Sequence, residues 1–359
     1  MKVSCHHLRP IFVCLTLLLS LNAMVTVQGA KVATPEEIEK VSQAIPDKIE
    51  PRKKHKVLVF SKAFTYYHSS IAVAKEMARQ MGQKTGLFDA DFTNDPKDLS
   101  AGNLKKYDAV YLNNSTSIER GLTTEKMRNE FLEFVRNGGG VVAIHAATDG
   151  GWPGYTDMIG GNFDGHPWGH QGTYCICNED LNHSVVSGIF DGNKSFKIND
   201  ELYQYKDFDR DQVRVLLSID MSKFENHRGG RKRDDDDYAM AWVKKYGKGR
   251  VFVSSPGHNH HIYWNKDILK MWYQGFRFVL NELEAETESK EKPGYALPPK
   301  EGRQDPVVRF KSPEESQKSF SLQDGYSLEL VADNPLVTEP TVCVWDGNGR
   351  MFVAEWRTY

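Results

Sequence analysis

The stretch Asn137-Gly-Gly-Gly-Val-Val-Ala-Ile-His-Ala-Ala-Thr-Asp-Gly-Gly151 decides the fold. A short apolar run from Val141 to Ile144 follows three glycines and stops at His145. A run that short, rich in β-branched residues and bounded by glycines, is typical of a buried strand in a parallel sheet. The chain then turns tightly, which places a polar side chain at the carboxyl end of the strand, where open α/β sheets bind ligands.

A nucleophile elbow has the same plan, but its tip carries Ser or Cys. Because the tip here is His145, the sequence predicts acid–base chemistry or ligand positioning rather than covalent attack.

Other apolar runs alternate with helical patterns around this strand. Strands are predicted at 56–61, 87–92 and 107–113, and helices at 70–81 and from about 123 to 136. Ser69 or Ser70 is a candidate cap for the first of these helices. Later strands are predicted at 172–177, 213–219, 239–244 and 250–254, with a last helix over 267–283. This alternation predicts an α/β fold with a doubly wound, mostly parallel sheet and helices on both faces.

The chain of 359 residues is predicted to have five parts. Residues 1–29 combine a basic start, a short apolar run and small residues, which is the layout of a secretory signal peptide; an uncleaved anchor is the alternative. A secreted or periplasmic protein is therefore expected. Residues 30–54 form an N-terminal extension with a short helix near 35–44, residues 55–283 the α/β domain, and residues 284–319 a charged linker. Residues 320–359 show short alternating strands around a hairpin-type turn at 346–349, too few to bury a core alone, so we expect a truncated second domain.

Composition excludes several classes of function. The formal net charge is -2 and charged residues make up 26% of the chain, which gives no reason to expect a nucleic-acid partner. No stretch after the first 29 residues approaches the length of a membrane span. Cys175, Cys177 and Cys343 are too few for a disulfide framework in a chain of this length.

Three histidines occupy equivalent places in the predicted topology. His68, His145 and His258 each follow a predicted core strand, and the doubly wound plan gathers these strand ends along one edge of the sheet. Each of them alone is also compatible with a histidine that caps a turn. Three at equivalent positions favour a ligand site.

Glu201 and Tyr203 lie on a connection expected to cross the same edge. A carboxylate beside histidines suits general acid–base catalysis, the orientation of an imidazole, or metal binding. A surface strand end is the alternative. The spacings His258-x-His260-His261 and His166-Pro-Trp-Gly-His170 match no defined zinc motif, so no metal ligand is assigned and the cofactor is left unknown, with a bound metal still open.

Aromatic residues flank these histidines, and aromatic faces beside polar donors suit a sugar ring. Ordinary core packing explains each of them equally well. The residues concerned are Trp152, Tyr155, Trp168 and Trp264.

Several motifs together resemble the ThuA-like (trehalose utilisation) family over residues 55–283. They are Phe64-x-x-x-His68-Ser-Ser-Ile, Gly138-Gly-Gly-Val-Val-Ala-Ile-His145, Gly160-Gly-x-Phe-x-x-His166-Pro, His183-Ser-Val-Val-Ser-Gly-Ile-Phe, Asp200-Glu-Leu-Tyr203, Ala241-Trp-Val-x-x-Tyr-Gly-Lys-Gly-Arg250 and Gly257-His258. The resemblance implies a flavodoxin-like, class I glutamine amidotransferase-like fold. Those amidotransferases use a Cys at the elbow, so a chain with His145 there should not hydrolyse glutamine. The resemblance also implies a link to trehalose and other disaccharides through 3-keto-sugar intermediates.

The last 40 residues resemble the opening of a β-propeller of the secreted, dehydrogenase-like type, on Phe320-x-Leu-x-x-Gly-Tyr and Asp346-x-x-Gly-Arg-Met-Phe-Val-Ala-Glu355. This resemblance implies a propeller and a cytochrome domain as partners in a longer protein. Without a C-x-x-C-H motif in the sequence, no haem is assigned.

The interpretation that unites these observations is a secreted carbohydrate-processing protein whose ligand is a saccharide. His145 and Glu201 are assigned to catalysis, with His145 as acid–base group or hydroxyl ligand, and six residues to substrate binding: His68, Asp149, Trp152, His166, Tyr203 and His258. Two interpretations stay open beside it, a non-catalytic sugar-binding module that serves a propeller dehydrogenase and a metal-dependent hydrolase. Glu201 next to His145 would favour the enzyme, and separation beyond hydrogen-bond reach with only aromatic residues in the pocket would favour the module.

Overall fold

The structure is a computed structural model that describes residues 32–46, 48, 50–292, 312–318, 320, 322, 325–332, 336–337 and 340–355. The predicted signal peptide lies outside the described residues. The chain forms two units, residues 1–295 and 296–359. Among the described residues, no helix is both long and apolar enough to cross a membrane.

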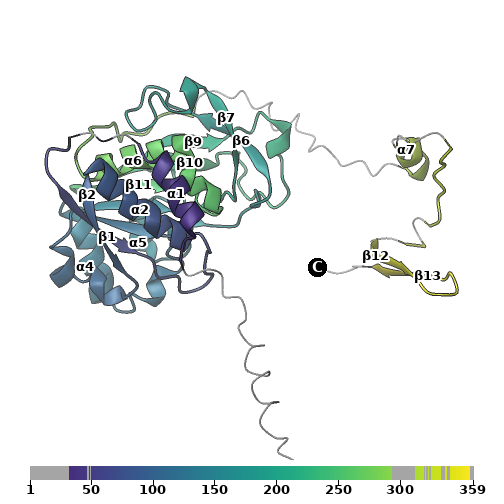
Figure 1. The fold of residues 1–359 in the computed structure, drawn as a ribbon, viewed down its shortest axis with the longest axis horizontal. Helices are drawn as coiled ribbons and strands as arrows, with labels where there is room; N and C mark the ends of the chain where they lie inside the picture. Colours follow the sequence, from purple (N-terminus) through teal and green to yellow (C-terminus); the bar gives the residue numbers. More distant parts are fainter. Residues whose placement is uncertain are drawn as a thin grey trace, which may run out of the picture. The chain divides into compact units, whose positions relative to one another are not determined.

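A nine-stranded mixed sheet forms the centre of the first unit (Figure 1). Its parallel half follows the order β2 (Phe88–Thr93), β1 (His55–Phe60), β3 (Ala109–Asn113), β4 (Gly140–Ile144) and β11 (Gly249–Ser254). The antiparallel half continues with β10 (Ala239–Tyr246), β9 (Arg214–Ile219), β6 (Thr173–Asn178) and β7 (Ser195–Asn199). The predicted α/β sheet is confirmed as a mixed sheet, in which the Gly140–Ile144 run is an interior strand between β3 and β11.

Helices cover both faces of the parallel half. On one face lie α2 (Ile71–Thr85) and α6 (Lys266–Val279), where Phe276 contacts the rings of Phe88 and Tyr111. Gly275 lets α6 lie close to β11, because a Cβ there would fall 2.4 Å from the ring of Phe252. On the other face lie α4 (Glu125–Arg136) and α5 (Pro153–Ile159). Their apolar residues form a core with alternate strand residues, among them Leu58, Val110, Val141 and Val251. Successive strand residues thus serve opposite faces, as pleating requires.

Smaller elements complete the unit. They are α3 (Ala101–Leu104) and the two-stranded pair β5 (Asn162–Phe163) and β8 (Tyr205–Lys206).

The helix predicted near 35–44 is confirmed as α1 (Pro35–Ala44). Thr34 and Glu37 form a capping box at its start, each side chain bonding to the other's backbone N–H. Gln80 of α2 donates to the Ile38 carbonyl at 3.0 Å, and His260 contacts Glu37 at 2.5 Å. The N-terminal extension is therefore attached to the domain through its helix.

The start of α2 differs from the prediction in one respect. Ser70 is the N-cap residue, but neither it nor Ser69 caps the helix through its side chain. The Ser70 hydroxyl instead donates to the carbonyl of Gly257 at 3.1 Å. This bond joins the loop after β1 to the loop after β11.

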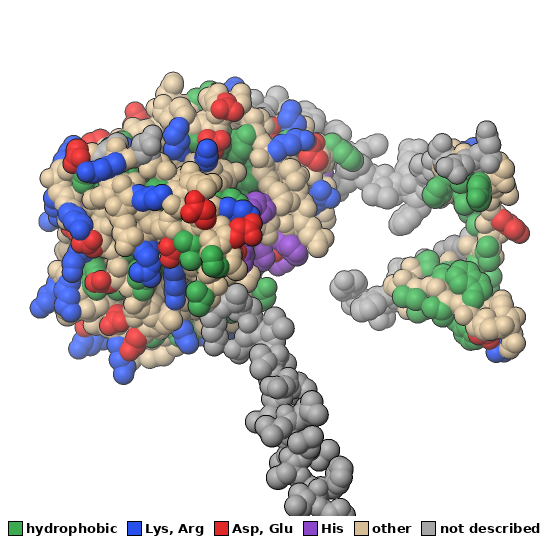
Figure 2. Space-filling model, viewed as in Figure 1, with side chains coloured by type: hydrophobic (Ala, Val, Ile, Leu, Met, Phe, Trp, Pro, Cys, Tyr) green, Lys and Arg blue, Asp and Glu red, His purple; other side chains and the backbone are tan. Residues whose placement is uncertain are grey.

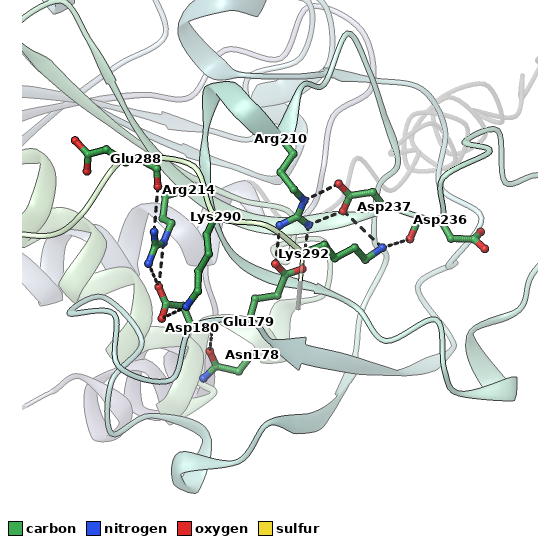
Figure 3. Close-up of polar contacts among 10 residues, drawn as sticks. All are labelled: Asn178, Glu179, Asp180, Arg210, Arg214, Asp236, Asp237, Glu288, Lys290 and Lys292. Carbon is green, nitrogen blue, oxygen red and sulfur yellow. Dashed lines mark hydrogen bonds and ion pairs between the residues drawn. The ribbon is translucent and has the colours of Figure 1, made fainter. Parts of the chain in front are cut away.

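A network of charged side chains lies beside β6 and β9 (Figure 3). Arg210 donates to both carboxylates that flank it, Glu179 and Asp237, and Arg214 pairs with Asp180. Lys290 and Lys292 extend the network by contacting Asp180 and Asp236, respectively. The segment 284–292, expected to begin the linker, is thereby bound to the domain, and the first unit continues to residue 295.

The second unit contains α7 (Pro313–Lys318) and a hairpin of β12 (Pro340–Trp345) and β13 (Met351–Glu355). Asp346 accepts bonds from the N–H groups of Asn348 and Arg350, which closes the predicted turn. Residues 326–331, expected as a strand, pair with no strand among the described residues. A propeller blade has four strands, so the described hairpin alone does not show the expected propeller.

Candidate functional site

His145 ends β4 and opens a 3₁₀ turn, His145–Thr148, with a backbone φ of +50°. This left-handed conformation is uncommon for a residue other than glycine and concentrates at functional sites. The side chain is fully buried, and its Nδ1 lies 2.7 Å from the carbonyl oxygen of Ser255. Gly257, in the loop after β11, lies close to His145, since a Cβ at Gly257 would be 3.0 Å from the His145 Cβ.

The contact with Ser255 defines the tautomer of His145. A carbonyl oxygen only accepts hydrogen bonds, so Nδ1 carries the proton and donates. The other nitrogen, Nε2, therefore carries a lone pair. It is buried and has no hydrogen-bond partner among the described residues.

The three predicted histidines converge, although they lie far apart in the sequence. The ring centroids of His68 and His145 are 4.9 Å apart, those of His68 and His258 5.1 Å, and those of His145 and His258 5.3 Å. All three pairs are close to perpendicular. Figure 2 shows histidine side chains gathered on one face of this unit. His68, His145 and His258, which follow three different strands, are thus neighbours at one edge of the sheet, as the predicted topology requires.

Glu201 joins them from the connection that follows β7. Its Oε1 lies 3.3 Å from His258 Nδ1 and 3.8 Å from His145 Nε2, and its Oε2 lies 3.6 Å from His166 Nδ1. The distance to His145 exceeds a hydrogen bond but is within ion-pair range. The connection is fixed across the sheet edge by the Tyr203 N–H, which donates to Ser255 Oγ at 3.0 Å.

Burial and charge separate the protonation states of these groups. Burial lowers the pKa of His68 to about 3, and burial together with the neighbouring histidines holds the pKa of His145 well below its usual range. For Glu201 and His258, burial opposes the charged form, but their mutual contact outweighs it. The pKa of Glu201 is lowered and that of His258 is raised. The site therefore combines two histidines in which the neutral form is favoured with a carboxylate and a histidine that stabilise each other's charged form.

Asp200 is a site residue that the sequence interpretation missed. It is fully buried and accepts the backbone N–H groups of Gly257 at 2.6 Å, His258 at 3.2 Å and Asn259 at 2.7 Å. Burial raises the pKa of Asp200 to about 7, while the three N–H donors favour its ionised form. Its position next to Glu201 in the Asp-Glu-Leu-Tyr motif is the sequence feature that could have identified Asp200 as a site residue. It positions the loop that carries His258.

A cavity of about 490 Å³ opens above the cluster. Six predicted site residues line it: His68, Asp149, His166, Glu201, Tyr203 and His258. Tyr66, Phe163 and His170 also line it and were not assigned to the site from the sequence. His145 itself does not line the cavity; its ring packs against Tyr203, with centroids 4.2 Å apart, beneath the floor. Burial raises the pKa of Asp149, and the nearby Glu119 adds to the effect.

The tryptophans lie elsewhere. Trp152, expected to bind substrate, packs against Tyr155 and under the guanidinium of Arg128. Trp168 is fully buried and donates to the Asn226 carbonyl, and Trp264 lies beneath Lys40. None of the three lines the cavity. The aromatic surfaces at the ligand position belong to Tyr66, Phe163 and Tyr203 instead.

The locally spaced histidine motifs also separate. His260 bonds to Glu37 and Ser69, whereas His261 Nε2 contacts the Asn199 carbonyl at 2.8 Å. Of the pair His166 and His170, both line the cavity, but only His166 is paired with Glu201.

Comparison with known families agrees with this geometry, since the family described as trehalose utilisation, ThuA, matches residues 56–279. The chain belongs to the ThuA family. Residues 312–359 match a second family, DUF7133, described as a domain of unknown function. Family membership gives the ThuA domain a carbohydrate-related function.

One of two similar solved structures shows the same fold, the one with a TM-score above 0.5. A ThuA-like protein from Bacteroides uniformis has 23% sequence identity and a TM-score of 0.53, with 65% of this chain and 94% of that chain covered. Another from Parabacteroides merdae has 22% identity and a TM-score of 0.48, with 68% and 94% covered. Among curated proteins, none matches the sequence.

Proposed function

We propose that the ThuA domain of this chain binds a saccharide, a disaccharide or 3-keto-glycoside, in the cavity above His68, Glu201 and His258 and acts on it as an enzyme. The observation that carries the proposal is the buried Glu201–His258 pair at the floor of a cavity of about 490 Å³. Ligand sites typically have volumes of about 300–1,000 Å³ and a few convergent polar groups.

The cavity walls suit a sugar. Tyr66, Phe163 and Tyr203 offer aromatic surface to the apolar face of a ring. Asp149 and His166 line the same cavity and offer polar atoms to hydroxyl groups at the ring edge. This arrangement supports the family's carbohydrate-related function in this chain.

Glu201 and His258 have complementary protonation states for acid–base catalysis. The lowered pKa of Glu201 keeps it ionised and able to accept a proton, and the raised pKa of His258 lets it supply one. On a 3-keto-glycoside, Glu201 would remove the proton from the carbon between the ketone and the anomeric carbon. The electron pair then forms a carbon–carbon double bond, the glycosidic C–O bond breaks, and His258 protonates the departing oxygen.

The alternative of a non-catalytic sugar-binding module is less well supported. A module needs aromatic and hydrogen-bonding surface, but it gains nothing from an ion pair whose carboxylate is about nine-tenths buried. Perturbed ionisable groups in a cavity are typical of reaction centres.

We also propose that the protein acts outside the cytoplasm. The basic start and short apolar run of residues 1–29 support export. N-terminal sequencing of the exported protein should begin close to Ala30, and a mature chain that retains Met1 would contradict export by cleavage.

The catalytic proposal is tested with Glu201→Gln and His258→Gln, using trehalose and a 3-keto-disaccharide as probes. Each variant should lower turnover by about 10²–10⁴-fold, the usual contribution of acid–base groups. His227→Ala is the matched control, because His227 contacts the Met221 carbonyl and the ring of Phe224 and is not among the residues that line the cavity. Circular dichroism checks the fold.

Sugar binding without turnover in the unaltered protein would favour the module. Absence of both sugar binding and turnover would refute the proposed function.

A further inference from the structure

The four residues at the floor of the cavity form a closed set of potential metal ligands. Each of His68, His145, Glu201 and His258 offers one ligand atom, and these atoms all lie within 4.8 Å of one another. They come from the loop after β1, the end of β4, the connection after β7 and the loop after β11. No two of them belong to the same local motif.

Two imidazole nitrogens in this set, His68 Nδ1 and His145 Nε2, are buried without a hydrogen-bond partner among the described residues. His258 Nδ1 faces Glu201 Oε1 at 3.3 Å. Buried polar atoms are rarely unpaired in native proteins, and each such atom calls for an explanation, of which a bound ion is one. His145 is the clearest example, because its side chain is fully buried and its proton is held on the opposite nitrogen by the Ser255 carbonyl.

The contact between His145 and Glu201 indicates that a ligand bound between them would be positively charged. The lone pair of His145 Nε2 faces the carboxylate oxygen Oε1 at 3.8 Å, and both atoms are acceptors. A cation between them would bind both.

The spacing fits a small divalent ion. Tetrahedral zinc binds nitrogen and oxygen at roughly 2.0–2.2 Å, which separates its ligands by about 3.4 Å. The separations of Glu201 Oε1 from His258 Nδ1, 3.3 Å, and from His145 Nε2, 3.8 Å, lie on either side of that value.

The donor types narrow the choice of metal. Imidazole suits zinc, iron, nickel and copper, whereas calcium and magnesium prefer all-oxygen sites. The Ser255 carbonyl that holds the His145 Nδ1–H is the kind of outer contact that orients metal-binding histidines.

We propose that His68, His145, Glu201 and His258 bind one divalent transition-metal ion of the zinc class, with a further coordination position open toward the cavity. As a statement about metal binding, the inference stands by itself. As a statement about catalysis, it rests on the proposed function and changes one part of it: the ion would bind oxygen atoms of the saccharide, and because Glu201 and His258 would then be metal ligands, Asp149 and His166 on the cavity wall would replace them in proton transfer.

The test uses the full chain, freed of any affinity tag and stripped of metal with a chelator. Titration calorimetry with Zn²⁺ and Mn²⁺, together with metal analysis, should show one ion per chain. Co²⁺ substitution should give the visible absorption of a nitrogen- and oxygen-ligated ion. Glu201→Gln and His68→Ala should each weaken Zn²⁺ binding by about 100-fold or more, because loss of even an outer contact costs about 10–100-fold.

His227→Ala is again the control and should bind Zn²⁺ like the unaltered chain. Absence of saturable binding in the folded, stripped chain would overturn the inference, as would equal losses in the control. The two proposals fail separately. Sugar turnover that persists in the stripped chain would show that the metal takes no part in the reaction, and the proposed function would stand. Metal binding without any sugar binding or turnover would refute the proposed function and leave the metal site standing.

Discussion

Two clusters of buried polar side chains lie in the same unit and differ in how their groups are paired. In the charged network beside β6 and β9, Arg210 makes four hydrogen bonds to Glu179 and Asp237 (Figure 3). In the histidine cluster, two buried ring nitrogens, His68 Nδ1 and His145 Nε2, have no hydrogen-bond partner among the described residues. A network whose charges neutralise one another holds the fold together, whereas a cluster with unused lone pairs is prepared for something that is not part of the chain.

The two clusters also differ in sequence origin. The network includes a segment, residues 284–292, that has little apolar content and is held to the domain by charged and polar contacts through Glu284, Lys290 and Lys292. The histidine cluster is built on the carboxyl ends of strands within the hydrophobic core. The difference predicts that disturbing the network changes stability, while disturbing the cluster changes ligand binding and the dependence of stability on pH.

The largest stability effect is expected for Arg210→Ala. Its guanidinium is the shared partner of two carboxylates whose side chains are only 2% and 9% exposed. Removing one partner of a buried ion pair costs about 3–5 kcal/mol, because the remaining charge stays buried and uncompensated. Urea denaturation of the full chain measures the loss.

Arg233→Ala is the matched control for this prediction. Arg233 also pairs with an aspartate, Asp235, but that carboxylate is more than half exposed. Its loss should cost about 1 kcal/mol or less. Equal losses for the two variants would contradict the assignment of the network as structural.

An intermediate effect is expected when the pH is lowered on the metal-stripped chain. The pKa of His68, about 3 in the folded chain, lies below its ordinary value of 6.5, so the unfolded chain takes up the proton first. The stability that neutral His68 contributes is complete above pH 6.5 and is lost as the pH falls toward 3. Between pH 6.5 and 5 the unfolding free energy should fall by about 2 kcal/mol, and His145 acts in the same direction.

The network behaves differently over the same range. Contacts with Arg214 and Lys290 hold the pKa of Asp180 below its ordinary value of 3.8, so its stabilising contribution is lost only below that pH. His258, whose pKa is raised, gives its full contribution below pH 6.5. His68→Gln should therefore flatten the pH dependence between 6.5 and 5. An unchanged slope in that variant would show that the cluster is not its source.

The smallest effect is expected for Lys290→Ala. The ammonium group contacts Asp180 at 3.1 Å but is about half exposed, and Arg214 continues to neutralise the same carboxylate. The expected loss is about 0.5–1 kcal/mol. Limited proteolysis adds a second measurement, because cleavage in 284–292 should be slow in the unaltered chain and faster in this variant. A loss above that of Arg210→Ala would reverse the order of importance within the network.

Much of the fold was predictable because its signals are local. The capping box at Thr34 and Glu37, the cap at Thr124 and the apolar run before His145 each identify an element from a few adjacent residues. The convergence of His68, His145 and His258 was predictable from topology, since parallel strands present their carboxyl ends at one edge.

The rest depended on contacts between distant segments. Nothing near Asp200 in sequence shows that its carboxylate accepts three N–H groups from residues 257–259. Trp152 is close to the site residue Asp149 in sequence, but its ring packs under the guanidinium of Arg128 on α4. The spacing of His258, His260 and His261 is similar to that of metal ligands without matching a defined motif, and their rings contact Glu201, Glu37 and Asn199, respectively.

The assembly of the histidine cluster from four separate segments makes ligand occupancy a measure of folding. His68 and His258 meet only when β1, β3, β4 and β11 are paired in this order in one sheet, so an unfolded chain has no equivalent site. An ion bound at this position would add its binding free energy to the folded state alone. At a free concentration 100 times the dissociation constant, that linkage amounts to about 2.7 kcal/mol. Metal supply would then set how much of this protein survives heat or proteolysis, independently of any reaction it carries out.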